Sequence, residues 1–238
     1  IAADNCDPEL CYKFNGCADV NIKGETQQID SLAIINCNNQ NILNINDCPY
    51  ELAKSAIRQI KKSYNIDALL VGYGGAGPYP QCFENLDYDQ KKIKAYEKKE
   101  EFLRMSFNYV KDLNPKYYMP FAGTYILTGK LSKLQDLRGV PSLEEAYNFL
   151  EKSLDQVNSK CIKLNPGSEF SLIDYTYSEP YKKINNNDVK KYIQDVLKKK
   201  KFEYEGDKEV TFDELLDLAR LSIKRFVKKK KELKVVLD

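Results

Sequence analysis

The feature that most constrains the fold is an apolar run, IDALLVGY at 66–73, that leads directly into the glycine-rich segment GGAGPYP. Such a run is typical of a strand buried on both faces of a sheet. Two β-branched segments at 29–36 and 41–46 precede it, and the Asn pair between them suits a hairpin turn. Apolar residues at helical spacing follow from Pro49, as the first residue of a helix, to about Tyr64. This order of elements predicts a layered α/β domain.

The next part of the chain continues the alternation of helices and strands. Residues 89–113 predict a helix with one buried face, and residues 115–125 predict a strand running into a loop. Ser142 and Glu145 have the spacing of a capping box that opens a further helix. The segment 161–173 reads as a strand, a Pro-Gly turn and a second strand. The apolar line that defines the buried face of the 89–113 helix consists of Ile93, Tyr96, Leu103, Phe107 and Val110.

The C-terminal part has a different composition. After about Pro180 the chain is rich in Lys and Asn, with predicted helices at 188–199 and 211–231, so we expect one domain over 1–180 and a Lys-rich helical extension, or the start of a further domain, over 181–238. Residues 1–90 carry 6 basic and 12 acidic side chains, whereas residues 91–238 carry 31 and 23. The lysine runs fall at helix ends, where they complement the helix dipole, and no aromatic residues alternate with them. Nucleic acid is therefore an unlikely partner.

Histidine is absent from all 238 residues, which excludes Ser/His/Asp and Cys/His catalysis within them and removes the commonest zinc ligand. The seven cysteines form no Cys-x-x-Cys pair, so we expect free thiols; only Cys6, Cys11 and Cys17 cluster, without an identifiable fourth metal ligand. No apolar run is long enough to span a membrane, and no signal-peptide pattern opens the sequence. These features predict a cytoplasmic protein without a membrane partner.

Three loops follow predicted strands, at 44–49, 72–80 and 119–125, and strand carboxyl ends are where ligands bind in α/β folds. Asp47 is a candidate metal ligand, but it could equally cap the helix that follows. The glycines of the second loop could suggest a phosphate site. Because two prolines rather than a helix come next, a loop that permits close approach of another segment or a ligand is the favoured interpretation.

Four segments taken in order resemble the metallo-β-lactamase-fold part of the CMP-N-acetylneuraminate hydroxylases. They are ILNINDCP, IDALLVGYGGAGPYPQCF, PKYYMPFAGTY and LNPGSEFSL, and the resemblance covers about residues 28–175. The family has an αββα sandwich made of two similar halves. The resemblance therefore implies an α/β fold that is the second half of such a sandwich, followed by a C-terminal helical appendage.

The resemblance also implies a metal-binding role for Asp47, because an Asp after a strand at this position contributes to the metal site of that superfamily. Most other ligands there belong to an H-x-H-x-D-H motif in the first half, which matches nothing in this chain. One carboxylate cannot hold a catalytic metal, so we expect a divalent metal, zinc or iron, only together with a missing N-terminal half or a partner chain. The implied rim of the active site consists of Gly74, Gly75, Gly77, Pro120, Phe121, Gly123 and Thr124.

The implied function is part of a metal-dependent enzyme that acts on a sugar nucleotide or a sialic-acid-like substrate, as a hydroxylase-like monooxygenase or as a hydrolase. Such an enzyme would not be competent as this chain alone. Hydroxylation would also require a Rieske iron–sulfur module from elsewhere, because no Cys-x-His pair is present to bind one. The alternative is a non-catalytic binding or scaffolding domain whose metal site is lost. The absent initial Met and the strand-like terminal KVVLD lead us to expect a fragment of a longer polypeptide.

Overall fold

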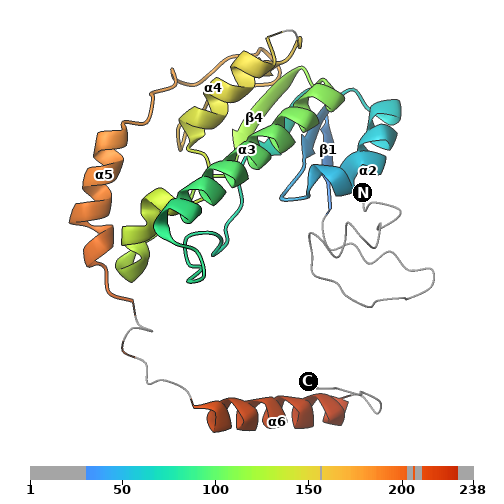
Figure 1. Cartoon of the computed structure of the whole chain (residues 1–238). Helices are drawn as coiled ribbons and strands as arrows, with labels where there is room; N and C mark the ends of the chain where they lie inside the picture. The colour runs from blue at the N-terminus through green and yellow to red at the C-terminus, as the bar shows by residue number, and fades with distance from the viewer. Residues whose placement is uncertain (1–30, 156, 203–205, 207–210, 230–238) are drawn as a thin grey trace. The chain divides into compact units, whose positions relative to one another are not determined.

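The computed structural model describes residues 31–155, 157–202, 206 and 211–229. The chain divides into two compact units, with the boundary between Lys198 and Lys199 (Figure 1). The expected boundary after residue 180 stays a prediction. Among the described helices, none has both the length and the apolar character needed to cross a membrane.

A mixed sheet of five strands organises the first unit, so the predicted α/β class is confirmed. The first two strands are antiparallel, and all the others pair in parallel with their neighbours. Asn38 and Asn39 both adopt positive φ angles, 50° and 61°, as a type I′ hairpin turn requires. The hairpin prediction is therefore confirmed. In spatial and chain order the strands are β1 (Ala33–Cys37), β2 (Gln40–Asn44), β3 (Ala68–Gly72), β4 (Tyr117–Phe121) and β5 (Lys160–Cys161).

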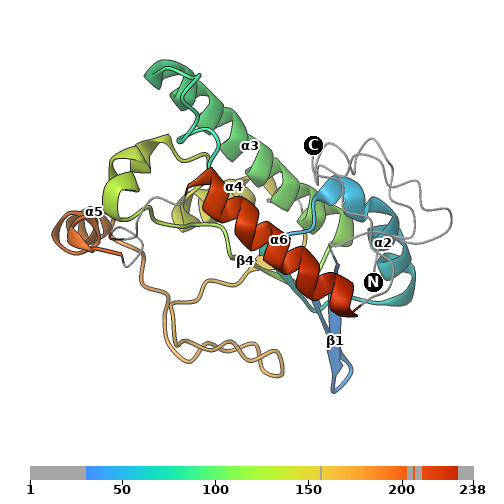
Figure 2. The same ribbon diagram turned by 90° about the horizontal axis from the view of Figure 1, so that it is seen from below.

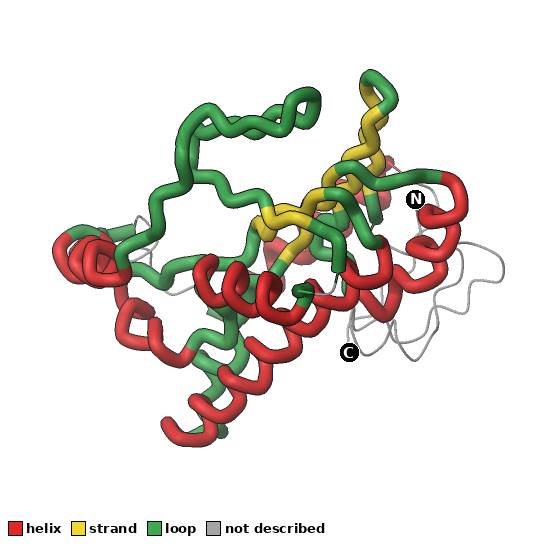
Figure 3. The backbone as a smooth tube through the Cα atoms, turned by 90° about the horizontal axis from the view of Figure 1, so that it is seen from above, coloured by secondary structure: helices red, strands yellow, loops and turns green. Residues whose placement is uncertain are grey.

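Three helices connect the successive parallel strands: α2 (Tyr50–Ser63), α3 (Tyr88–Leu113) and α4 (Leu143–Ser153). Because each crossover advances in the same direction along the sheet and crossovers are right-handed, the three helices lie on one face (Figures 1 and 3). Helix α3 lies between the other two and contacts both. The main core fills the space between these helices and the sheet. Its members include Leu43, Leu69, Val71 and Tyr118 from the strands and Ala53, Ile57, Tyr109, Val110 and Leu150 from the helices.

The opposite face of the sheet is only partly covered. Side chains alternate along a strand, so Leu70 and Met119, which are neighbours in the register, point away from the helices. Both are half-buried, and Ile35 on the edge strand is 54% exposed. The rings of Phe170 and Tyr175 pack on the Tyr117 ring at one end of this face. The helices of the first unit leave the rest of it uncovered (Figure 3).

Helix α3 is longer than the sheet can cover. Its 26 residues span about 39 Å, whereas a five-residue strand spans about 17 Å. The N-terminal turns therefore extend past the sheet (Figure 2), and Ile93 and Tyr96 are 57% and 65% exposed. Their expected place on the buried face is wrong, whereas Leu103 and Val110 are buried as predicted.

The segments after α4 depart most from expectation. Of the strand, turn and strand expected over 161–173, only Cys161 joins the sheet, in β5 with Lys160, and Phe170 makes an isolated bridge with Tyr177. Two 3₁₀ segments and two further helices complete the described chain. They are η1 (Gly129–Leu137), α5 (Asn186–Asp195), η2 (Leu197–Lys199) and, in the second unit, α6 (Phe212–Lys229). A capping box of Thr211 and Glu214 opens α6, since the amide of each residue donates to the side chain of the other.

Candidate functional site

The carboxyl ends of β2, β3 and β4 lie at one edge of the sheet because these strands are parallel, and the three predicted loops meet there. A Cβ added at Gly72 would lie 3.2 Å from the carbonyl oxygen of Asn46. A Cβ added at Gly74 would lie 2.5 Å from the carbonyl oxygen of Gly123. Segments 44–49, 72–80 and 119–125 are therefore neighbours at this edge.

Asp47 lies in the turn after β2. The Asn44 side chain accepts a hydrogen bond from the Asn46 amide at 2.8 Å, and Asn46 has a positive φ of 53°. The Asp47 side chain is exposed and has no hydrogen bond or ion pair within the described part of the chain. Helix α2 begins at Tyr50 with Pro49 as its N-cap and no side-chain cap bond. The interpretation of Asp47 as a helix cap is therefore wrong, and Pro49 precedes the helix rather than beginning it.

The glycines of the loop after β3 allow other groups to approach the backbone. Gly74 faces Gly123, and a Cβ added at Gly123 would lie only 2.3 Å from the Tyr73 ring. A Cβ added at Gly75 would meet the Phe102 ring at 3.2 Å, whereas Gly77 has nothing closer than 3.8 Å. The next helix, α3, begins only at Tyr88. The close-approach interpretation of these glycines is borne out for Gly74, and no helix N-terminus follows to hold a phosphate.

The loop after β4 is fixed by a short chain of hydroxyl groups. Thr124 donates to the carbonyl oxygen of Pro141 at 3.0 Å, so Tyr73, 3.0 Å from the same Thr124 oxygen, is the donor in their contact. Burial raises the pKa of the Tyr73 phenol, which keeps it protonated at neutral pH. Pro120 is buried within β4 beside Val71, and Phe121 is half-buried at the strand end.

A metal centre is not complete in the described residues. They contain no group of three or more His, Cys, Asp or Glu side chains that could hold a metal ion. A catalytic zinc or iron needs about three protein ligands, so Asp47 alone is not enough to hold such a metal. Cys37, Cys82 and Cys161 are free thiols, as expected. The N-terminal cluster of Cys6, Cys11 and Cys17 lies outside the described residues.

A polar cluster beside the glycine loop was not predicted from the sequence. We define the polar cluster as Gln81, Lys98, Tyr125, Gln135 and Arg138. Gln81 is only 2% exposed, and its amide donates to the carbonyl oxygen of Gly77 at 2.5 Å and to the Tyr125 hydroxyl at 3.2 Å. The Arg138 guanidinium lies 5.5 Å from the centre of the Tyr125 ring. These residues come from three separate stretches of the chain, at 81, at 98 and at 125–138, so only the fold brings the three stretches together.

No family model, curated protein or solved structure matches this chain. The fold and the site therefore define a class and nothing narrower: an α/β domain with a mixed five-stranded sheet, helices on one face, and an exposed carboxylate and glycine loops at the carboxyl edge of the parallel strands.

Proposed function

We propose that this chain is the second half of a metallo-β-lactamase-like αββα sandwich and contributes one ligand, Asp47, to a metal-dependent enzyme. The substrate class implied by the sequence resemblance is a sugar nucleotide or a sialic-acid-like sugar. The observation that carries the proposal is the exposed carboxylate of Asp47, which has no partner among the described residues and lies at the edge where β2, β3 and β4 end. A metal ligand needs a carboxylate that is deprotonated and not already used by a structural contact.

The partly uncovered face of the sheet supports the proposal that a second layer completes the sandwich. Sheets of parallel strands occur almost only with both faces covered, because their strands are apolar on both sides. Here Leu70 and Met119 are half-buried and Ile35 is more than half exposed on the face away from the helices. A second sheet, from another segment of the same polypeptide or from a partner chain, would cover these side chains. The remaining metal ligands would come from that layer.

The described residues have defined tasks in such an enzyme. Asp47 would bind the metal, which when present supplies either a Lewis acid for hydrolysis or an oxygen-activating centre for hydroxylation. The contact between Gly74 and Gly123 holds the two rim loops together, and the Tyr73 hydroxyl fixes the second loop through Thr124. Hydroxylation requires an electron supply, for which a Rieske iron–sulfur module is the partner we propose.

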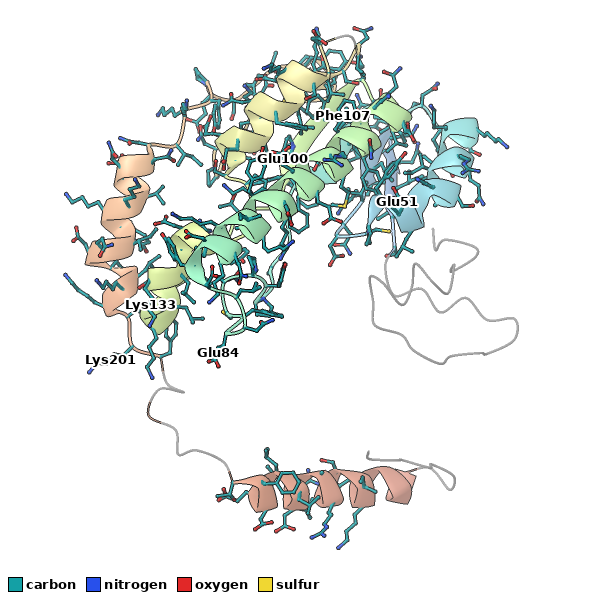
Figure 4. The ribbon with its side chains drawn as sticks, viewed as in Figure 1. Glu51, Glu84, Glu100, Phe107, Lys133 and Lys201 are labelled. Carbon is teal, nitrogen blue, oxygen red and sulfur yellow. The ribbon has the colours of Figure 1, made fainter. Side chains whose placement is uncertain are left out.

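The experiment is a measurement of bound metal in the protein purified from its native source without chelators. We expect a transition metal in the natural protein and at least about tenfold weaker retention after Asp47→Asn, because even residues that only support a ligand contribute tenfold or more. Glu84→Gln is the matched control, because Glu84 is an exposed carboxylate on the loop after β3 (Figure 4) without a partner in the described residues. Its metal content should not change.

Two results would contradict the proposal. One is a natural protein without a bound transition metal, and the other is unchanged metal retention in the Asp47→Asn variant. Either would favour the binding or scaffolding domain with a lost metal site. An iron–sulfur absorbance in the purified complex would favour the hydroxylase over the hydrolase, and a metal-loaded protein without such a partner would favour the hydrolase.

A further inference from the structure

The polar cluster contains hydrogen-bonding atoms that the protein itself does not satisfy. Among the described residues, three buried side-chain polar atoms have no hydrogen-bond partner: Oε1 of Gln81, Nε2 of Gln135 and Nη1 of Arg138. All three belong to this one cluster. Leaving a buried polar atom without a hydrogen-bond partner is unfavourable, so three such atoms in one cluster call for an explanation.

The cluster also contains two partly buried cations without a contacting acid. Burial lowers the pKa of Lys98 and of Arg138. Within the described part of the chain, neither forms an ion pair, and the acids that act on them electrostatically, Glu101 on Lys98 and Asp136 and Glu145 on Arg138, lie beyond salt-bridge distance. Arg138 stays charged at neutral pH because a guanidinium does not lose its proton in proteins. Desolvated charges are rarely left without a counter-charge.

The two cations are held in the same region by specific contacts. The Lys98 ammonium donates to the carbonyl oxygen of Tyr79 at 2.9 Å, and its aliphatic stem packs so closely on Gly139 that a Cβ there would lie 2.7 Å from Cδ. Gly139 directly follows Arg138, whose Nε donates to the carbonyl oxygen of Gln135 at 2.9 Å. The cluster therefore joins the loop after β3, helix α3 and η1.

We propose that the polar cluster binds the oxyanion of a small ligand that also carries hydroxyl groups, with the oxyanion being a carboxylate or a phosphate. The unsatisfied donors, Nη1 of Arg138 and Nε2 of Gln135, bind the anionic oxygens. The unsatisfied acceptor, Oε1 of Gln81, binds a ligand hydroxyl. Sugar acids and sugar phosphates both have this combination. The inference goes beyond the proposed metal centre and does not depend on it.

Charge separates this proposal from the simpler one that ordered water fills the cluster. Water can satisfy a buried donor or acceptor, and it often does so in proteins. It cannot neutralise two partly buried cations. An oxyanion does both, because charge-assisted hydrogen bonds from guanidinium are stronger than bonds to neutral acceptors.

The test uses titration calorimetry on the whole protein with three probes at constant ionic strength. Gluconate presents a carboxylate with hydroxyls, glucose 6-phosphate presents a phosphate with hydroxyls, and glucose presents the hydroxyls alone. We expect at least one anionic probe to bind and glucose not to bind, and the preferred probe identifies the oxyanion. If neither anion binds, or if glucose binds equally well, the proposal is overturned and water completes the cluster.

The Gln135→Glu variant separates binding from folding. The Gln135 side-chain oxygen accepts a hydrogen bond from the Leu127 amide at 2.8 Å, and glutamate keeps that acceptor. The substitution replaces the unsatisfied donor with a negative charge beside Arg138. We expect the melting temperature to be kept or raised while affinity for the anion falls at least tenfold. Retained anion affinity in this folded variant would overturn the proposal.

The Arg138→Gln variant removes one cation and should weaken anion binding by about tenfold or more, in line with the value of a hydrogen bond to a charged group. Arg104→Gln is the matched control, because Arg104 is an exposed arginine on α3 that is not one of the residues of the cluster. Its affinity should match the natural protein. Equal losses in both variants would mean that only the overall charge attracts the anion, and the site would be rejected.

Discussion

The backbone at residue 123 must be glycine because the ring of Tyr73 lies against it. A methyl group added there would lie 2.3 Å from two ring carbons, so either the ring or the loop must move. We expect Gly123→Ala to lower the free energy of unfolding by about 1–3 kcal/mol. The matched control is Gly77→Ala, whose added carbon would lie 3.8 Å from its nearest neighbour. Urea unfolding measures both, and equal stability of the two variants would contradict the observed packing.

The thiol of Cys161 makes the free energy of unfolding depend on pH in the alkaline range. Burial, and secondarily the charge of Glu151, raises its pKa to about 12, whereas an unfolded cysteine titrates near 8.5. Above pH 8.5 the unfolded chain loses this proton and the folded protein keeps it, so the unfolded state binds fewer protons and the free energy of unfolding falls as pH rises.

The expected slope from Cys161 is at most about 1.4 kcal/mol per pH unit, measured by urea unfolding between pH 8.5 and 10. The Cys161→Ala variant should lack this contribution. Cys37→Ala, which removes an exposed thiol, should keep it. The same pH dependence in all three proteins would show that other groups cause it.

At the scale of a single element, the capping box at the start of α4 gives a direct test. The Ser142 hydroxyl accepts from the Glu145 amide at 3.2 Å, and the Glu145 carboxylate accepts from the Ser142 amide at 2.7 Å. Ser142→Ala should lower the free energy of unfolding by about 1 kcal/mol. Thr128 occupies the N-cap position of η1 without a side-chain cap bond, so Thr128→Ala should have almost no effect. Thermal unfolding distinguishes the two, and an equal loss in both variants would contradict the assigned cap.

Local patterns predicted most elements because each has its own signal in the sequence. The hairpin has its Asn pair, β3 has its apolar run and α4 has its capping box. Helix α3 shows the limit of that reasoning, because Ile93 continues the apolar line but lies beyond the end of the sheet. The segment 161–173 shows another limit. Its residues resemble a strand, but only Tyr117 and Tyr118 of β4 pair with β5.

At the scale of the molecule, the sheet has one covered face and one largely uncovered face. Two adjacent leucines point to opposite faces, so substituting each of them tests one face. Leu69 is fully buried against the helices, and Leu70 points to the other side. We expect Leu69→Ala to cost about 2–5 kcal/mol of unfolding free energy, and Leu70→Ala to cost less than half as much in this chain alone. Chemical denaturation measures both. Equal costs would mean that this chain already covers both faces.

The sequence predicted only those parts of the candidate site whose positions follow from the order of the strands. Asp47 and the rim glycines follow strands, and parallel strands bring their carboxyl ends together without further information. The polar cluster depends on long-range packing instead. Gln81, Lys98 and Arg138 meet because α3 crosses beside two loops, and no spacing in the sequence encodes that contact.

The most direct test of the proposed metal centre is a crystal structure of the metal-loaded native protein with anomalous data at the metal edge. The account predicts an anomalous peak about 2.0–2.2 Å from a carboxylate oxygen of Asp47, with the other ligands donated by a second layer over the uncovered sheet face. A metal bound elsewhere, with the Asp47 carboxylate free in the loaded protein, would contradict the account.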